Sequence, residues 1–210
     1  MEVHPPHGSV HSIKDFMVHI LAITIGLLMA QGLESTAEWW HHQSQVREAR
    51  QNIAHEIRDN EDRVAHELAS LPKEQDQLTW LMGEVSNREH GKAATPHEAL
   101  VWTAGRLSES SWNTAYSTGA VAHMDYDEVR RYAHIYALQE LFNSSMDKYL
   151  ESRRDMYAFL TRAQLPDKPS AAEYEYGKRA IAAEMVTGQF LREIAETLRS
   201  SYTKESGEGR

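Results

Sequence analysis

The sequence predicts an all-α protein, in which an N-terminal transmembrane helix continues into a long helix that packs in an extramembrane helical bundle. One apolar run near the N-terminus, apolar side chains at helical spacing after it, and only 11 Gly and 6 Pro in 210 residues predict this fold. We expect four parts along the chain. Residues 1–11 form a disordered tail, 12–40 the transmembrane helix and its interfacial exit, 41–203 the helical bundle domain, and 204–210 a second disordered tail.

The apolar run covers residues 16–33 and contains no Lys, Arg, Asp or Glu. In a helix its 18 residues span about 27 Å, close to the ~30 Å thickness of the hydrocarbon core of a bilayer. Trp39 and Trp40 follow, and tryptophan favours the headgroup layer, so both are predicted at the membrane interface. The alternative is a cleaved signal peptide, since Ser-Thr-Ala at 35–37 has small residues at the spacing for cleavage. The length of the run and the two tryptophans favour the anchor.

Charges beside the apolar run indicate a topology. Lys14 precedes the run, whereas the first charges after it are Glu34 and Glu38. By the positive-inside rule, this asymmetry predicts a cytoplasmic N-terminus and a C-terminal domain that faces the periplasm or the cell exterior.

Small residues recur at every fourth position of the apolar run. Ala22, Gly26 and Ala30 fall on one helix face, and such a pattern lets two membrane helices approach closely. We expect this face to pack against a membrane protein partner or a second copy of the chain. The alternative is that the strip faces lipid, because Ala and Gly are common in membrane helices.

The helix is predicted to continue beyond the membrane as far as Pro72. Five apolar residues mark its buried stripe at spacings of 7, 4, 7 and 4, which combine into a period of eleven: Val46, Ile53, Ile57, Val64 and Leu68. An eleven-residue period indicates a nearly straight or slightly right-handed seam. A second helix is expected after Pro72, followed by a loop at 87–94.

The remaining helices are predicted from start signals and apolar stripes. Thr95, Pro96 and Glu98 open a third helix that carries Leu107, and residues 108–124 form a turn-rich connection in which Trp112 and Tyr116 plug the end of the bundle. Asp125 with Glu128 opens a helix to about Thr161, whose Tyr132, Tyr136 and Tyr149 belong to the core with hydroxyls bonded to backbone or water. Ser170 with Glu173 opens the last helix, whose inner stripe is Tyr174, Ile181, Met185, Phe190, Leu191, Ile194 and Leu198.

A candidate metal site lies on the long helix. His55, Asp59, Asp62 and His66 are spaced 4, 3 and 4 apart and share one face, and two imidazoles with two carboxylates are ligands for a divalent ion. The alternative is a solvated polar face whose ions pair with nearby Arg and Glu.

Composition excludes several function classes. A net charge of -9 argues against nucleic-acid binding, which needs clustered Lys and Arg. The chain has no cysteine, so disulfides, thiolate catalysis and Cys-ligated zinc are excluded. No Gly-x-Ser-x-Gly elbow accompanies the serines near residue 110. We therefore expect no enzyme activity and no cofactor.

Degenerate motifs in the chain resemble those of small uncharacterised bacterial single-pass membrane proteins. An acidic residue, a hydrophobic residue and an asparagine follow the anchor in those families, here Glu56, Ile57 and Asn60. A Trp and Gly segment then precedes a Tyr-rich helix, here Trp112, Gly119, and Tyr132 or Tyr136. The resemblance implies an inner-membrane anchor with a helical periplasmic domain, and it implies no particular activity.

Three functions remain open at this point. The first is a membrane-anchored interaction protein, an accessory or scaffold subunit of a membrane protein complex. The second is a periplasmic ligand-sensing domain of the four-helix type, because helical bundles can bind small molecules between their helices. The third is a metal-binding helical protein that uses the face from His55 to His66.

Overall fold

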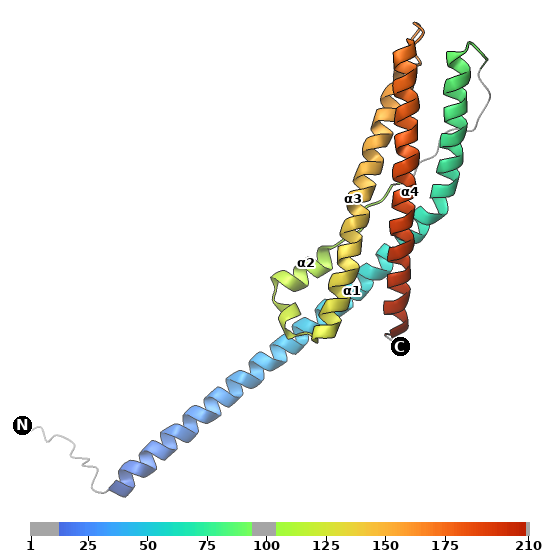
Figure 1. Cartoon of the computed structure of the whole chain (residues 1–210). Helices are drawn as coiled ribbons and strands as arrows, with labels where there is room; N and C mark the ends of the chain where they lie inside the picture. The colour runs from blue at the N-terminus through green and yellow to red at the C-terminus, as the bar shows by residue number, and fades with distance from the viewer. Residues whose placement is uncertain (1–12, 94–103, 209–210) are drawn as a thin grey trace, which may run out of the picture. The chain divides into compact units, whose positions relative to one another are not determined.

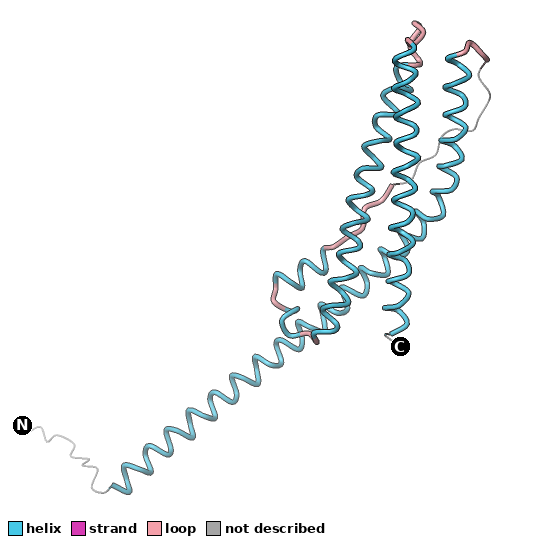
Figure 2. Tube along the Cα trace, viewed as in Figure 1, coloured by secondary structure: helices cyan, strands magenta, loops and turns pink. Residues whose placement is uncertain are grey.

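The computed structural model describes residues 13–93 and 104–208, and all regular structure within these ranges is helical (Figures 1 and 2). The elements are α1 (Ile13–Glu89), α2 (Ser110–Ser117), the 3-10 helix η1 (Ala120–His123), α3 (Tyr126–Arg162) and α4 (Ala171–Glu208). The all-α class is confirmed, as is a long N-terminal helix that packs with later helices. The chain divides into two compact units, Met1–Glu48 and Ala49–Arg210, where the sequence prediction placed the boundary at residues 40–41.

The second unit is built from three long helices whose directions follow from their contacts. Arg50 pairs with Glu128, and further along α1 Glu74 pairs with Arg153, so α1 and α3 run parallel. Arg153 also pairs with Glu184, and Arg162 pairs with Glu173, so α3 and α4 run antiparallel. Because α1 and α3 are parallel, the chain between them has to return along the bundle. Residues 104–109 are a non-helical stretch that leads into α2 and makes part of this return (Figure 2).

Each of the three helices buries a heptad-like seam. Buried residues alternate at spacings of four and three, which keeps one stripe of a helix against its neighbours. On α1 they are Ile53, Ile57, Asn60, Val64, Glu67, Leu71, Glu74, Leu78, Leu81 and Val85. On α3 they are Tyr132, Ile135, Gln139, Phe142, Met146, Tyr149, Arg153 and Met156, and on α4 Tyr174, Gly177, Ile181, Glu184, Gly188, Leu191, Ala195, Leu198 and Tyr202. The eleven-residue spacing expected on α1 therefore describes only part of its seam.

The prediction that the first helix ends at Pro72 is wrong, because α1 continues through this residue to Glu89. A proline inside a helix loses one backbone hydrogen bond and costs about 3 kcal/mol. Burial of Leu71, Leu78 and Leu81 around it offsets that cost. Figure 1 shows α1 changing direction in its teal part, the stretch that contains Pro72, as expected where the hydrogen-bond ladder is interrupted.

The loop predicted at 87–94 begins three residues later in its described part, because α1 is helical through Glu89. Gly91 has a φ of 74°, and the N–H of Lys92 donates to the carbonyl of Asn87 while that of Gly91 donates to Arg88. This is the Schellman geometry that ends a helix at a left-handed glycine. The helix start expected at 95–98 lies outside the described residues.

Three expectations for the middle of the chain differ from the structure. Leu107 lies in the non-helical segment 104–109 and not in a helix, and the connection 108–124 contains α2 and η1. Trp112 is half-buried, but Tyr116 is 73% exposed and plugs nothing.

Both remaining helix starts are confirmed by their capping contacts. The Asp125 side chain accepts from the backbone N–H groups of Asp127 and Glu128 at the start of α3. Before α4, the N–H of Glu173 donates to Ser170 Oγ at 3.3 Å, and the N–H of Ser170 donates to Glu173 Oε2 at 2.7 Å. These reciprocal bonds are a capping box.

The end of the chain differs from the prediction in two ways. Phe190, expected on the inner stripe of α4, is 59% exposed, because it falls between the seam residues Gly188 and Leu191 on the outer side. The predicted tail from residue 204 is helical as far as Glu208, since Tyr202 and Leu198 are buried and hold the last turns of α4.

We expect Gly177→Ala to lower the free energy of unfolding by about 1–3 kcal/mol, the range for overpacked cores. The ring of Phe159 occupies the place where a Cβ at residue 177 would lie, and Phe159 is itself buried. Chemical denaturation of the full-length protein in detergent measures this loss. Gly83→Ala is the matched control: it is also helical but has no atom within 4 Å of its Cβ position, so it should gain about 0.5–1 kcal/mol from helix propensity. Equal effects at both positions would contradict the close approach at Gly177.

Candidate functional site

The first candidate site is the exposed apolar segment of α1. Within the described residues, α1 is the one helix long and apolar enough to cross a membrane, and none of its 18-residue apolar window is buried. Two polar side chains of the apolar run bond within the helix: His19 Nδ1 lies 2.8 Å from the Asp15 carbonyl oxygen, and the Thr24 hydroxyl donates to the Ile20 carbonyl at 2.8 Å. A helix with satisfied backbone groups and an apolar surface is compatible with a lipid environment.

The residues predicted for packing and for the interface all lie on this exposed part of α1. Ala22, Gly26 and Ala30 are exposed, and no atom lies within 4 Å of a Cβ at Gly26. Trp39 and Trp40 are exposed too, with ring centroids 5.5 Å apart in an edge-on arrangement. The small-residue strip is thus open to a neighbouring helix, and the tryptophans are open to solvent or lipid.

The predicted metal ligands do not form a metal centre. His55 Nδ1 lies 3.0 Å from Asp59 Oδ2, and both side chains are exposed. In the part of the chain that the structure describes, no three His, Asp or Glu side chains are grouped closely enough to hold an ion. His55, Asp59, Asp62 and His66 therefore fit the alternative of a solvated polar face.

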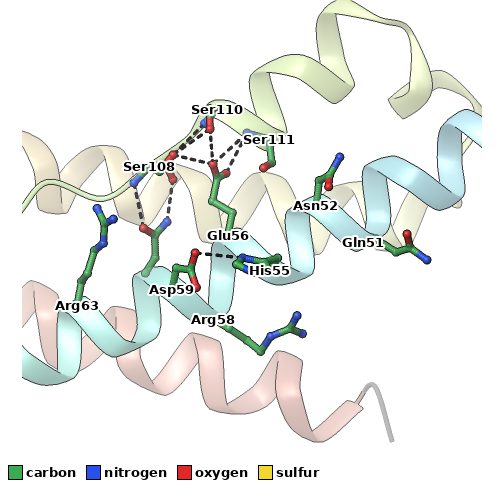
Figure 3. A pocket seen from close by; sticks show the side chains of 11 residues that line it. Gln51, Asn52, His55, Glu56, Arg58, Asp59, Arg63, Ser108, Ser110 and Ser111 are labelled. Carbon is green, nitrogen blue, oxygen red and sulfur yellow. Dashed lines mark hydrogen bonds and ion pairs between the residues drawn. The ribbon is translucent and has the colours of Figure 1, made fainter.

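The second candidate site is a polar cluster around Glu56, which projects from α1 toward the start of α2 (Figure 3). The hydroxyls of Ser108 and Ser110 each donate to Glu56 Oε2 at 2.7 Å, and the backbone N–H of Ser111 donates at 3.0 Å. From α3, the hydroxyl of Tyr136 donates to Glu56 Oε1 at 2.7 Å. One carboxylate thus caps the N-terminus of α2 and joins it to α1 and α3.

Two asparagines hold the non-helical segment 106–109, which we call the strap. Asn60 of α1 accepts from the N–H of Ser108 at 3.0 Å and donates to its carbonyl at 2.7 Å. Asn143 of α3 does the same for Leu107, at 2.8 and 3.0 Å. The side-chain amides supply the hydrogen-bond partners that a non-helical backbone would otherwise need, so both backbone groups of each residue are satisfied.

Charged and aromatic contacts surround the strap. Arg63 donates to the carbonyl of Arg106, and the Arg106 side chain pairs with Asp147. Trp112 stacks on Tyr136 with centroids 5.4 Å apart and planes 15° apart. The strap is therefore fixed to α1 and α3 at several points along its length.

The electrostatics of Glu56 favour a structural role over proton transfer. Burial raises the pKa of the Glu56 carboxyl, but the hydrogen bonds from Ser108, Ser111, Ser110 and Tyr136 together outweigh burial and hold this pKa below its ordinary value. A carboxylate with a lowered pKa is a weak general base. The groove beside it, about 610 Å³, is lined by polar side chains that include Gln51, His55 and Arg63.

The third candidate site is a buried charge cluster in the middle of the bundle, formed by Glu74, Arg153 and Glu184. Arg153 Nη2 lies 2.6 Å from Glu74 Oε2, and Arg153 Nε lies 2.8 Å from Glu184 Oε1. The side chains of Arg153, Glu74 and Glu184 are only 8, 2 and 0% exposed. The hydroxyl of Tyr149 donates to Glu74 Oε2 at 2.8 Å, and the guanidinium carbon lies 4.5 Å from the Tyr149 ring centroid. The cluster joins one residue from each long helix.

No protein-family model, no curated protein and no solved structure matches this chain. Sequence reasoning reached Glu56 and Asn60 through the resemblance, but it missed Asn143 and the charge cluster. The sequence does contain a signal for the charge cluster. Arg153 and Glu184 occupy seam positions between apolar residues, where charged side chains are rare.

Proposed function

We propose that the protein is a membrane-anchored helical interaction protein, an accessory or scaffold subunit of a membrane protein complex. The observation that supports this function best is the apolar window of α1, none of which is buried. An exposed apolar surface of this size on a helix is suited to lipid or to another protein. The bundle supplies a rigid soluble domain, because its polar core residues are joined across helices by hydrogen bonds and ion pairs.

The proposal also covers the membrane in which the protein is anchored and the side on which the bundle lies. Lys14 before the apolar run and Glu34 after it favour a cytoplasmic N-terminus and a periplasmic bundle. The resemblance carried by Glu56, Ile57 and Asn60 supports the inner membrane of a bacterium as the site of the anchor.

Within this proposal, Ala22, Gly26 and Ala30 form the contact with a partner helix, from another membrane protein or a second copy. We expect the tagged full-length protein, extracted in mild detergent, to co-purify with defined membrane proteins or with a differently tagged copy of itself. A variant with Ala22→Leu, Gly26→Leu and Ala30→Leu should lose these partners, because the added side chains hold two helices apart. Mass spectrometry of the purified material measures both outcomes.

The matched control adds volume to the other side of the same helix, with Thr24→Leu and Leu28→Phe. This control should keep the partners. Wild type and the triple variant emerging alone and alike would contradict the accessory-subunit function. The intact mass of the same preparation separates the anchor from a cleaved signal peptide, because cleavage after residue 37 would remove the whole apolar run.

A further inference from the structure

The buried charge cluster has more negative than positive groups. Arg153 carries one positive charge, and it is shared between the carboxylates of Glu74 and Glu184 at 2.6 and 2.8 Å. With both carboxylates ionised, the cluster would hold one uncompensated negative charge where all three side chains are at most 8% exposed. An uncompensated charge in such surroundings is costly, and a group there binds a proton instead.

The carboxylates of Glu74 and Glu184 differ in the hydrogen bonds that they accept. Glu74 Oε2 accepts from both the Tyr149 hydroxyl and Arg153 Nη2. Glu184 Oε1 accepts from Arg153 Nε, while its other oxygen, Oε2, is buried without a hydrogen-bond partner among the described residues. Hydrogen bonds stabilise the charged form of a carboxylate, so Glu184 is the better place for a proton.

We propose that the Glu74–Arg153–Glu184 cluster binds one proton in the folded bundle, held on Glu184, and that loss of this proton with rising pH weakens the packing of α1, α3 and α4. The bundle is then stabilised by protons at a site that senses the pH on its side of the membrane.

Each titratable group that faces Glu184 is consistent with this charge state. Burial raises the pKa of the Glu184 carboxyl, and the nearby Glu74 raises it further, while the hydrogen bond from Arg153 only partly opposes these effects. Burial lowers the pKa of the Arg153 guanidinium, but its hydrogen bond to Glu184 and the other negative groups outweigh burial, so Arg153 stays charged. Burial also raises the pKa of the Tyr149 hydroxyl, which stays neutral.

The direction of the pH effect follows from the raised pKa. Glu184 titrates near its ordinary value of 4.5 in the unfolded chain and above that value in the folded bundle. Between these two values folding takes up one proton, so the folding equilibrium constant should fall up to tenfold per pH unit as the pH rises. Below 4.5 this site has no pH dependence.

The infrared spectrum of the full-length protein in detergent micelles tests the proposal directly. A protonated carboxyl has a C=O stretch that a carboxylate lacks. Difference spectra between wild type and Glu184→Gln, recorded as the pH rises from 4.5, should therefore show one carboxyl that stays protonated to a higher pH than an ordinary glutamate. Glu74→Gln should remove the same band, because Arg153 then pairs with Glu184 alone and Glu184 ionises. Absence of the band from wild type, or its retention in Glu74→Gln, would overturn the proposal.

A second measurement does not depend on the spectrum. The ratio of the folding equilibrium constants of wild type and Glu184→Gln should fall with rising pH above 4.5, because all other titrating groups are common to both proteins. A ratio that is constant with pH would overturn the proposal. Glu151→Gln, an exposed glutamate on α3, is the matched control and should leave the pH dependence of wild type unchanged.

Discussion

Replacing Arg153 with Met is expected to lower the free energy of unfolding by about 3–5 kcal/mol, the range for breaking a buried ion pair by removing one partner. Without the guanidinium, the Glu74 carboxylate is buried without its cation, and the Glu184 carboxyl loses the hydrogen bond from Arg153 Nε. Denaturant unfolding of the full-length protein in detergent measures the loss. Arg154→Met is the matched control: its side chain is 73% exposed and its pair with Glu151 lies at the surface, so we expect a change of at most about 0.5 kcal/mol.

A triple variant separates the lost charge from lost packing. With Glu74→Gln and Glu184→Leu added to Arg153→Met, no buried charge remains and the Tyr149 hydroxyl keeps an acceptor at residue 74, so stability should return close to that of wild type or exceed it. If the triple variant is as unstable as Arg153→Met alone, the loss comes from the other contacts of Arg153, among them the Tyr149 ring, and not from an unpaired Glu74 carboxylate.

Buried polar residues on α1 explain why its periodicity is hard to predict from the sequence. Its buried seam has a regular heptad, but Asn60, Glu67 and Glu74 occupy every second seam position in the middle of the helix. The period of eleven uses Leu68, which lies beside the seam, in place of the buried residues Glu67 and Leu71. Buried polar residues are recognised in a sequence only when their partners on other helices are known, and Gln139 and Arg153 lie about 80 residues away.

Helix starts could be predicted because their signals are local. Asp125 and Ser170 cap helices through bonds that span two or three residues, so the sequence alone contains both donor and acceptor. Pro72 was misjudged for the opposite reason, since whether a helix tolerates a proline depends on what the flanking residues bury. The position of Leu107 depends likewise on Asn143, 36 residues further along the chain.

The apolar segment of α1 could be predicted in full, because length and composition alone decide whether a helix is able to cross a bilayer. The candidate sites in the bundle could not be predicted from the sequence, because each one is assembled from two or three helices. The Glu56 motif illustrates the difference: the resemblance indicated its spacing on α1, while Ser110, Ser111 and Tyr136 give it its role in holding α2 and the strap.

Replacing Glu56 with Ala is expected to lower the free energy of unfolding by about 2–4 kcal/mol and to release the strap. The change leaves the Tyr136 hydroxyl and the Ser111 N–H without their acceptor, and an unsatisfied buried donor costs about 1–3 kcal/mol. Hydrogen exchange of the peptide that covers residues 104–111 should accelerate more than exchange in α4. Asp59→Ala, which removes an exposed carboxylate of the same groove, should change neither stability nor exchange measurably.

The pH dependence of the Glu56 variant has a defined sign. The pKa of Glu56 is lowered in the folded protein, so its stabilising contribution is complete above the unfolded value of 4.5 and is lost as the pH falls through the folded pKa. The stability difference between wild type and Glu56→Ala should therefore shrink at acid pH.

Tyr136→Phe removes one donor and leaves the carboxylate, so it should cost less than Glu56→Ala and leave exchange at Ser111 slow. Rapid exchange of the strap in wild type itself would contradict the proposed role of Glu56, because the observed hydrogen bonds would then contribute little to holding α2 against α1.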